Sequence, residues 1–76
     1  MKIEAGKKYH LRGGLTCEVF EIRLYNSAGN RVTFPVKGHI LRTTPTGRVK
    51  RDYNIWKLNG QAMAVGEHMH DIIEEV

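Results

Sequence analysis

Apolar and polar residues alternate along the middle of the chain with the period of a β-strand. One face is apolar or small at alternate positions, namely Val32, Phe34, Val36, Gly38 and Ile40. The other face carries Arg31, Thr33, Lys37 and His39. This pattern predicts one long strand over residues 31–40. Pro35 lies on the polar face and cannot donate a ladder hydrogen bond, so an edge strand or a bulge is expected there.

Two other apolar stretches change phase along their length. Cys17 and Val19 share one face, whereas Phe20, Ile22 and Leu24 share the opposite one, which predicts a β-bulge near Phe20. A similar slip separates Tyr53 and Ile55 from Trp56 and Leu58. Strands that bend in this way tend to roll into a small barrel rather than a flat sheet.

Turn-forming residues interrupt these stretches about every ten residues, as in small all-β domains. They fall at Gly13-Gly14, residues 26–30, residues 43–47 and Asn59-Gly60. Asn59-Gly60 predicts a type I′ hairpin. Residues 67–76 suit either a helical turn or a short turn leading into a closing strand. The β-branched residues Ile72, Ile73 and Val76 favour the closing strand.

The sequence therefore predicts a single all-β domain over residues 1–76. The expected fold is a small SH3-like or OB-like barrel of about five strands, with a short turn or helical turn near the C-terminus. A chain of 76 residues buries only about 60% of its unfolded surface, so the core is thin. Small domains without disulfides or metals often associate, and a homo-oligomer is expected.

Composition narrows the class of protein. Apolar residues make up 41% and charged residues 26%, as in ordinary soluble domains. No apolar run approaches the roughly 20 residues of a membrane span, and the first residues lack the apolar core of a secretory signal. The single cysteine, Cys17, excludes an internal disulfide. We expect a cytoplasmic protein without a membrane partner.

Charge is distributed unevenly along the chain. Seven basic residues lie between Arg31 and Lys57 against one acid, and the sign reverses after Leu58. Tyr53 and Trp56 lie inside this basic stretch, and cations beside exposed rings suit an anionic ligand that has a π-face. The predicted phosphate contacts are Arg12, Lys37, Arg42, Arg48 and Arg51, with Tyr53 or Trp56 stacking on a base, and His39 is a further predicted ligand-binding residue. The alternatives are that these charges are solvated side chains protecting an edge strand, and that Trp56 anchors the core.

Other reactive residues have simpler interpretations. His68 and His70 would share one side of a strand, but no second motif supplies further ligands, so no metal is expected. Cys17 lies in an apolar run and is expected in the core. Glu74 and Glu75 lie at the chain end, without the cleft that acid–base catalysis needs. We expect a non-catalytic protein without a cofactor.

The chain resembles a group of very short phage and prophage proteins that begin with G-K-x-Y-x-x-R-x-G. Here that start is Gly6 to Gly14, with Gly13 in place of the usual Asp before the turn glycine. The group continues with an aromatic-Pro-Val-x-Gly segment, a Trp before a Gly-containing turn, and a closing Asp-[Ile/Leu]-[Ile/Val]-Glu-Glu. The corresponding residues are Phe34–Gly38, Trp56 with Gly60, and Asp71–Glu75. The resemblance implies a compact β-rich accessory protein of phage origin in the bacterial cytoplasm.

By analogy with phage proteins of this size, the expected function is binding. The leading hypothesis is an oligomeric anti-defence protein that sequesters a nucleotide-derived small anion, such as a host antiviral signal. One alternative is a nucleic-acid-binding module that uses the same residues in an open groove. The other is an inhibitor that binds a host defence protein directly. This analogy rests on size, origin and charge.

Overall fold

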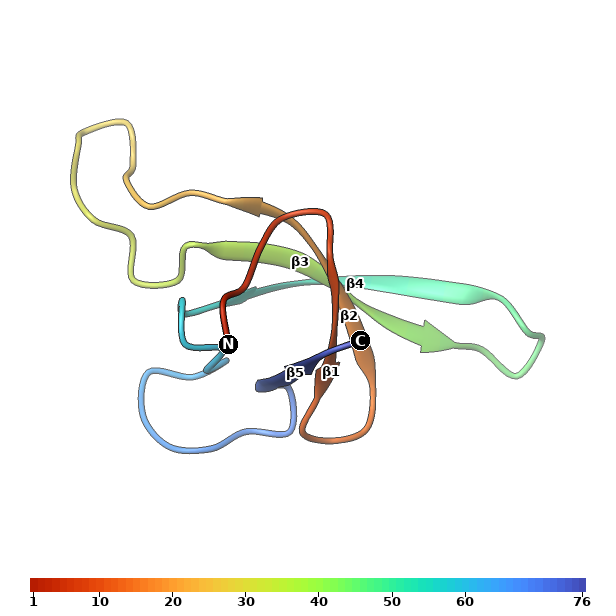
Figure 1. Cartoon of the computed structure of the whole chain (residues 1–76). Helices are drawn as coiled ribbons and strands as arrows, with labels where there is room; N and C mark the ends of the chain where they lie inside the picture. The colour runs from red at the N-terminus through yellow and green to blue at the C-terminus, as the bar shows by residue number, and fades with distance from the viewer.

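The computed structural model describes all residues, 1–76, and shows an all-β protein. Its strands are β1 (Lys8–Leu11), β2 (Thr16–Ile22), β3 (Val36–Thr43), β4 (Val49–Trp56) and β5 (Ile72–Glu75) (Figure 1). They form one five-stranded antiparallel sheet in the order β4-β3-β2-β1-β5. The predicted fold class, strand number and closing strand are therefore confirmed. The chain contains no helix that is long and apolar enough to span a membrane.

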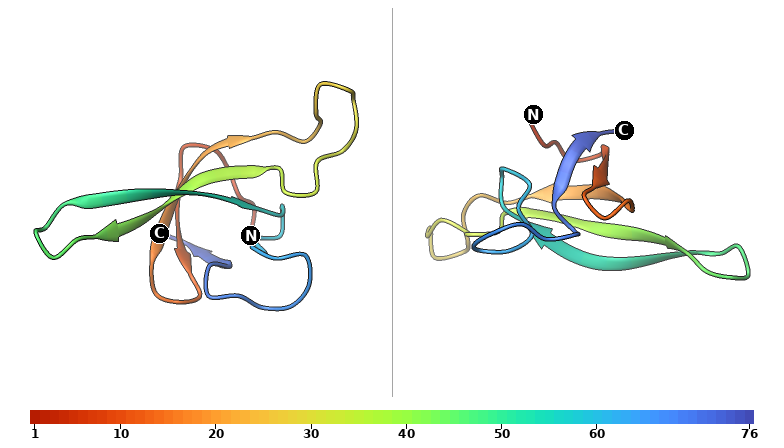
Figure 2. Two further views of the ribbon diagram at one scale, coloured as in Figure 1. Left: turned by 180° about the vertical axis from the view of Figure 1, so that it is seen from behind. Right: turned by 90° about the horizontal axis from the view of Figure 1, so that it is seen from below.

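The first four strands follow one another as hairpins, and β5 returns to pair with β1. The sheet curves strongly, so that β1 and β5 stand above the long β3–β4 ribbon in the right-hand view of Figure 2. No pairing joins β4 to β5, so the barrel-like sheet is not closed. The β3–β4 hairpin and the loop over residues 23–35 project at opposite ends of a molecule 44 Å long.

The concave side of the sheet holds the core. Nine apolar side chains are buried there, namely Ile3, Tyr9, Leu11, Cys17, Val19, Val36, Ile40, Trp56 and Ile72. Both large rings have partners for their polar atoms. The indole of Trp56 donates to the carbonyl oxygen of His70 at 2.7 Å, and the hydroxyl of Tyr9 accepts from the backbone N–H of Glu4 at 2.7 Å. The polar atoms of both buried rings are therefore hydrogen bonded, so that burying them leaves no unpaired group.

The predicted bulge in β2 is confirmed. The register between β2 and β3 shifts between Val19 and Glu21, so Phe20 is the extra residue. Val19 lies in the core, Phe20 is 48% exposed, and Ile22 packs against the core again. Phe20 points outward because it follows the buried Val19, and the bulge then returns Ile22 to the core side.

The second predicted slip, in β4, is wrong. The β3–β4 register runs without interruption from Val36–Trp56 to Thr43–Val49. Trp56 points into the core, whereas Tyr53 and Ile55 point to the other side and are exposed. The pattern resembled a slip because β4 carries apolar residues on both faces.

One strand prediction and one turn prediction also need correction. The strand predicted over residues 31–40 begins only at Val36, and β3 is an inner strand rather than an edge. Pro35 fits because it lies one residue before the strand, where its carbonyl oxygen accepts from the N–H of Arg23. Asn59-Gly60 forms a turn, with Gly60 at φ 93°, but Asn59 has no positive φ, as type I′ would require. No adjacent strand follows this turn, so the hairpin is absent.

A buried carboxylate fixes the segment before β5. Asp71 is 3% exposed and accepts hydrogen bonds from the backbone N–H groups of Ala62 at 2.8 Å and His68 at 2.9 Å. The guanidinium of Arg12 lies 3.5 Å away. Burial alone raises the pKa of Asp71, but these donors outweigh it and hold the pKa below its ordinary value. Arg12 and Asp71 therefore tie the β1–β2 hairpin to the start of β5.

Candidate ligand-binding face

The side of β2, β3 and β4 that points away from the core is here called the outer face. Residues that alternate with the core positions line it, and the register sets them in rows across the strands. One row joins Glu18, His39 and Tyr53. The adjacent rows on β3 and β4 pair Lys37 with Ile55 and Leu41 with Arg51.

Three aromatic rings gather on the outer face and form what we call the aromatic cluster: Phe20, His39 and Tyr53. The rings of Phe20 and His39 are stacked, with centroids 5.0 Å apart and an interplanar angle of 24°. The ring of Tyr53 lies 6.3 Å from Phe20 and 6.2 Å from His39. Tyr53 is 59% exposed, so the cluster presents ring surface to solvent from three adjacent strands.

Local structure explains why these rings meet. His39 and Tyr53 are register partners, so their side chains stand next to each other on the same face. Phe20 joins them because it follows the inward-facing Val19 on β2 and therefore points to the outer face. Phe20 was not among the predicted site residues. The phase change at Phe20 in the sequence was the available sign, but it could not show which neighbours the ring would meet.

Cations flank the aromatic cluster, and two of them are paired with acids. Arg51 Nε lies 2.8 Å from Glu18 Oε1, and Lys37 Nζ lies 3.5 Å from Glu21 Oε2. The hydrogen bond from Arg51 lowers the pKa of the Glu18 carboxyl. Lys8 has no carboxylate within ion-pair distance and lines a hollow of about 390 Å³ beside Phe20. Exposed ion pairs are weak, so an incoming phosphate can take over either cation at little cost.

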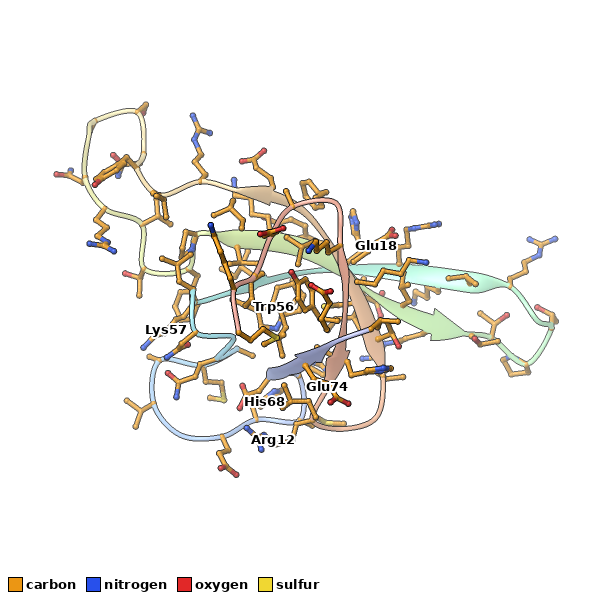
Figure 3. The ribbon with its side chains drawn as sticks, in the orientation of Figure 1. Arg12, Glu18, Trp56, Lys57, His68 and Glu74 are labelled. Atoms are coloured by element: carbon orange, nitrogen blue, oxygen red, sulfur yellow. The ribbon has the colours of Figure 1, made fainter.

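The predicted site residues divide among several places. Lys37, His39, Arg51 and Tyr53 share the outer face. Arg42 lies on the opposite face, where its Nε is 2.7 Å from Asp52 Oδ2 and its Nη2 is 3.4 Å from His70 Nε2. Arg48 lies at the tip of the β3–β4 hairpin. Arg12 lies at the other end of the β1–β2 hairpin from Glu18, as Figure 3 shows.

The prediction that Trp56 stacks on a ligand is wrong. Its side chain is 0% exposed and occupies the centre of the core in Figure 3. The physical reason is the phase of β4, which turns Trp56 inward opposite Val36. The alternative interpretation of Trp56, as a core anchor, is the correct one.

Ion pairing divides the twelve Lys and Arg side chains into two equal groups. The six with a carboxylate within 4.0 Å are Lys7, Arg12, Lys37, Arg42, Lys50 and Arg51. The six without one are Lys2, Lys8, Arg23, Arg31, Arg48 and Lys57. Of the five predicted phosphate-binding Lys and Arg residues, only Arg48 belongs to the second group. Which Lys and Arg side chains are available to a ligand depends on where each acid lies, and the fold sets those positions.

The remaining reactive residues, one cysteine and two histidines, lie in packed environments. Cys17 is buried, and this burial raises the pKa of its thiol to about 11. The rings of His68 and His70 contact each other edge to face at 4.9 Å. Burial, helped by the nearby His68 and Arg42, lowers the pKa of His70. No group of three or more His, Cys, Asp or Glu side chains is arranged to hold a metal ion.

The outer face can therefore offer a ligand flat ring surface at its centre and positive charge around it. A π-system can lie on the aromatic cluster while phosphates reach Lys8, Lys37 or Arg51. No protein-family model, no curated protein and no solved structure matches the chain.

Proposed function

We propose that this protein is a non-catalytic binder of single-stranded nucleic acid, and that the strand lies across the outer face. The aromatic cluster stacks on the bases, and Lys8, Lys37 and Arg51 contact the backbone phosphates. The observation that carries the proposal is the exposed cluster of Phe20, His39 and Tyr53, with centroids 5.0–6.3 Å apart.

The energetics of stacking support this assignment. Stacking of a base on an aromatic side chain contributes about 1–3 kcal/mol and tolerates any base, because every base has a π-face. The rings come from β2, β3 and β4, so successive bases of a strand that crosses the sheet each meet aromatic surface. The formal net charge of +4 adds a general attraction for a polyanion.

The open shape of the outer face favours a polymer over the small anion expected from the sequence. Pockets for small ligands bury roughly 70–90% of the ligand surface. One sheet face covers only one side of a nucleotide, so sequestration requires a second subunit to cover the other side. A strand of nucleic acid needs no such cover, because it gains affinity from several shallow contacts.

Fluorescence anisotropy with a labelled oligothymidylate tests the proposal. Tyr53→Ala should weaken binding roughly five- to a hundredfold, since one stacked base is lost. Tyr25→Ala is the matched control, because Tyr25 is 58% exposed but lies outside the aromatic cluster. Equal losses in the two variants, or no binding by the unmodified protein, would refute the proposal.

Competition separates this function from the two others considered. Excess AMP or a cyclic dinucleotide should displace little of the oligothymidylate if the ligand is a strand. The logarithm of the affinity should also fall with the logarithm of salt by roughly 0.7 per contacted phosphate. Efficient displacement by free nucleotide would instead favour the sequestration of a small anion, with a homo-oligomer enclosing it. A pull-down that returns one stoichiometric host protein would favour an inhibitor.

A further inference from the structure

The largest hollow of the molecule lies away from the aromatic cluster. It measures about 490 Å³ and opens between the end of the 23–35 loop and the turn that follows β4. Arg31, Thr33 and Pro35 line it from the loop, and Lys57, Leu58 and Asn59 line it from the turn. We call it the cation cleft. Its volume falls within the roughly 300–1,000 Å³ of ordinary ligand pockets.

Both charged side chains of the cation cleft are positive, and neither has a carboxylate within 4.0 Å. No Asp or Glu lines the cleft. Lys37 and Arg51 on the outer face differ in this respect, because acids already neutralise them. An anion that enters the cation cleft therefore does not have to displace a carboxylate.

The backbone holds both cation-bearing segments in place. Arg31 pairs with Tyr25 in an isolated β-bridge, and the N–H of Val32 donates to the carbonyl oxygen of Leu24 at 2.9 Å. On the other wall, the N–H of Lys57 donates to the carbonyl oxygen of Gln61 at 2.9 Å. The Lys57 ammonium donates to the carbonyl oxygen of Ala64 at 2.9 Å, which fixes it and leaves two of its hydrogens for a ligand.

The cation cleft lies at one end of the β3–β4 ribbon. Val36 and Trp56 are the last register pair of β3 and β4, and both point into the core. Pro35 and Lys57 come directly outside these two strand ends, so the cation cleft lies beyond the last register pair of the ribbon. Figure 3 shows Lys57 at the end of the molecule away from the β3–β4 tip.

We propose that the cation cleft is a separate binding site for a phosphate monoester. A guanidinium binds two phosphate oxygens in a bidentate manner and an ammonium binds as a point charge, so Arg31 and Lys57 together suit a dianion. The Thr33 hydroxyl offers a further donor, and Leu58, which is 41% exposed, offers apolar surface to the organic part of the ester. Two sources share this chemistry: a free nucleotide, and the terminal phosphate of a strand on the outer face. The site itself does not depend on the function proposed above.

Titration of the ¹⁵N-labelled protein with AMP and with inorganic phosphate tests the site. Saturable amide shifts are expected at residues 31–35 and 57–59, beyond those caused by chloride at equal ionic strength. Arg31→Ala and Lys57→Ala should each weaken AMP binding about tenfold or more, because each removes charged donors. Arg48→Ala is the matched control, since Arg48 is also unpaired and exposed but lies at the opposite tip. Shifts no larger than those with chloride, or equal losses in Arg48→Ala, would overturn the proposal.

Oligothymidylates that carry or lack a 5′-phosphate distinguish the two sources of the phosphate, a free nucleotide and the end of a strand. A strand end in the cation cleft should make the phosphorylated oligomer bind severalfold tighter, and Arg31→Ala should remove that difference. AMP binding that survives Tyr53→Ala, without a difference between the oligomers, identifies a free nucleotide. Failure of the nucleic-acid function alone would appear as lost oligomer binding with intact AMP binding.

Discussion

The two faces of β4 carry aromatic residues three positions apart, with opposite fates. Trp56 on the inner face is sealed in the core and hydrogen bonded to His70, whereas Tyr53 on the outer face is 59% exposed. The inner face therefore specifies the fold, and the outer face is free to present chemistry to a ligand. The same strand does both because its side chains alternate.

The residues of the phage and prophage sequence pattern can be compared with those of the outer face. Residues that carry it include Tyr9, Trp56 and Asp71, which lie in the core or in the buried hydrogen-bond network beneath β5. Phe20, His39 and Tyr53 are not part of that pattern. Fixed positions of that pattern therefore largely build the fold, whereas Lys8 and Lys37, two of the proposed phosphate contacts, occupy its variable positions.

The largest expected effect on the inner face is that of Trp56→Ala. Truncating a buried Trp costs about 3–5 kcal/mol, and a domain of this length has a total stability of roughly 4–11 kcal/mol. The variant should be largely unfolded or strongly destabilised in urea titrations followed by circular dichroism. Tyr53→Ala should shift stability by less than about 0.5 kcal/mol, as exposed substitutions usually do. Similar losses in both variants would remove the distinction between the faces.

Gly38→Ala should also destabilise the protein through the inner face. A Cβ at this position would lie 2.4 Å from the carbonyl oxygen of Glu18 and 3.1 Å from Trp56. Forcing β2 and β3 apart should cost about 1–3 kcal/mol or more. Gly29→Ala is the comparison, because Gly29 has φ +81° in open space. This variant should lose only about 1–2 kcal/mol of stability, through the backbone strain that alanine has at positive φ. Thermal denaturation of the two variants measures which loses more stability. A larger loss of stability in Gly29→Ala would contradict the close packing around Gly38.

Acid should weaken the network around Asp71. Its pKa lies below the ordinary 3.8 in the folded protein, so its carboxylate stabilises the fold fully above that pH. The contribution is lost as the pH falls through the lowered pKa. Asp71→Asn should cost about 1–3 kcal/mol at neutral pH, because it removes charge-assisted hydrogen bonds. It should also flatten the fall in stability on acidification below the ordinary pKa of 3.8. An unchanged acid profile in the variant would show that Asp71 is not the group responsible.

The smallest effect is expected from the outer face itself. Glu18→Gln removes the partner of Arg51, and an exposed ion pair contributes at most about 1 kcal/mol. Stability should therefore hardly change, while affinity for oligothymidylate should rise about twofold or more because one negative charge leaves the binding face. Glu4→Gln is the control, since Glu4 pairs with Lys7 and lies outside the outer face. Weaker binding in Glu18→Gln would place the strand elsewhere.

Much of the fold followed from the sequence because alternation and turn residues are local properties. They predicted the all-β fold class, the bulge at Phe20 and the final strand that includes Ile72. The start of β3 was missed because Val32 and Phe34 keep the alternation, although their segment forms a loop. The sequence left two interpretations of Trp56 open, core anchor or stacking platform, because both faces of β4 carry apolar residues.

The candidate site was less predictable because it depends on contacts between distant residues. Arg51 is paired with Glu18, which lies 33 positions away in the chain, and Arg12 is paired with Asp71. Neither pairing can be inferred from local sequence. Even the acid-free stretch of residues 22–51 does not identify the unpaired cations. It holds the paired Lys37, Arg42, Lys50 and Arg51 as well as the unpaired Arg23, Arg31 and Arg48.

The most direct test of the nucleic-acid function is an NMR titration of the labelled protein with oligothymidylate. The ring signals of Phe20, His39 and Tyr53 should shift in a saturable manner, because the strand stacks on them. The single indole N–H, that of Trp56, should stay unchanged, because it donates to His70 inside the core. A saturable shift of the indole signal with unchanged ring signals of the aromatic cluster would contradict the account.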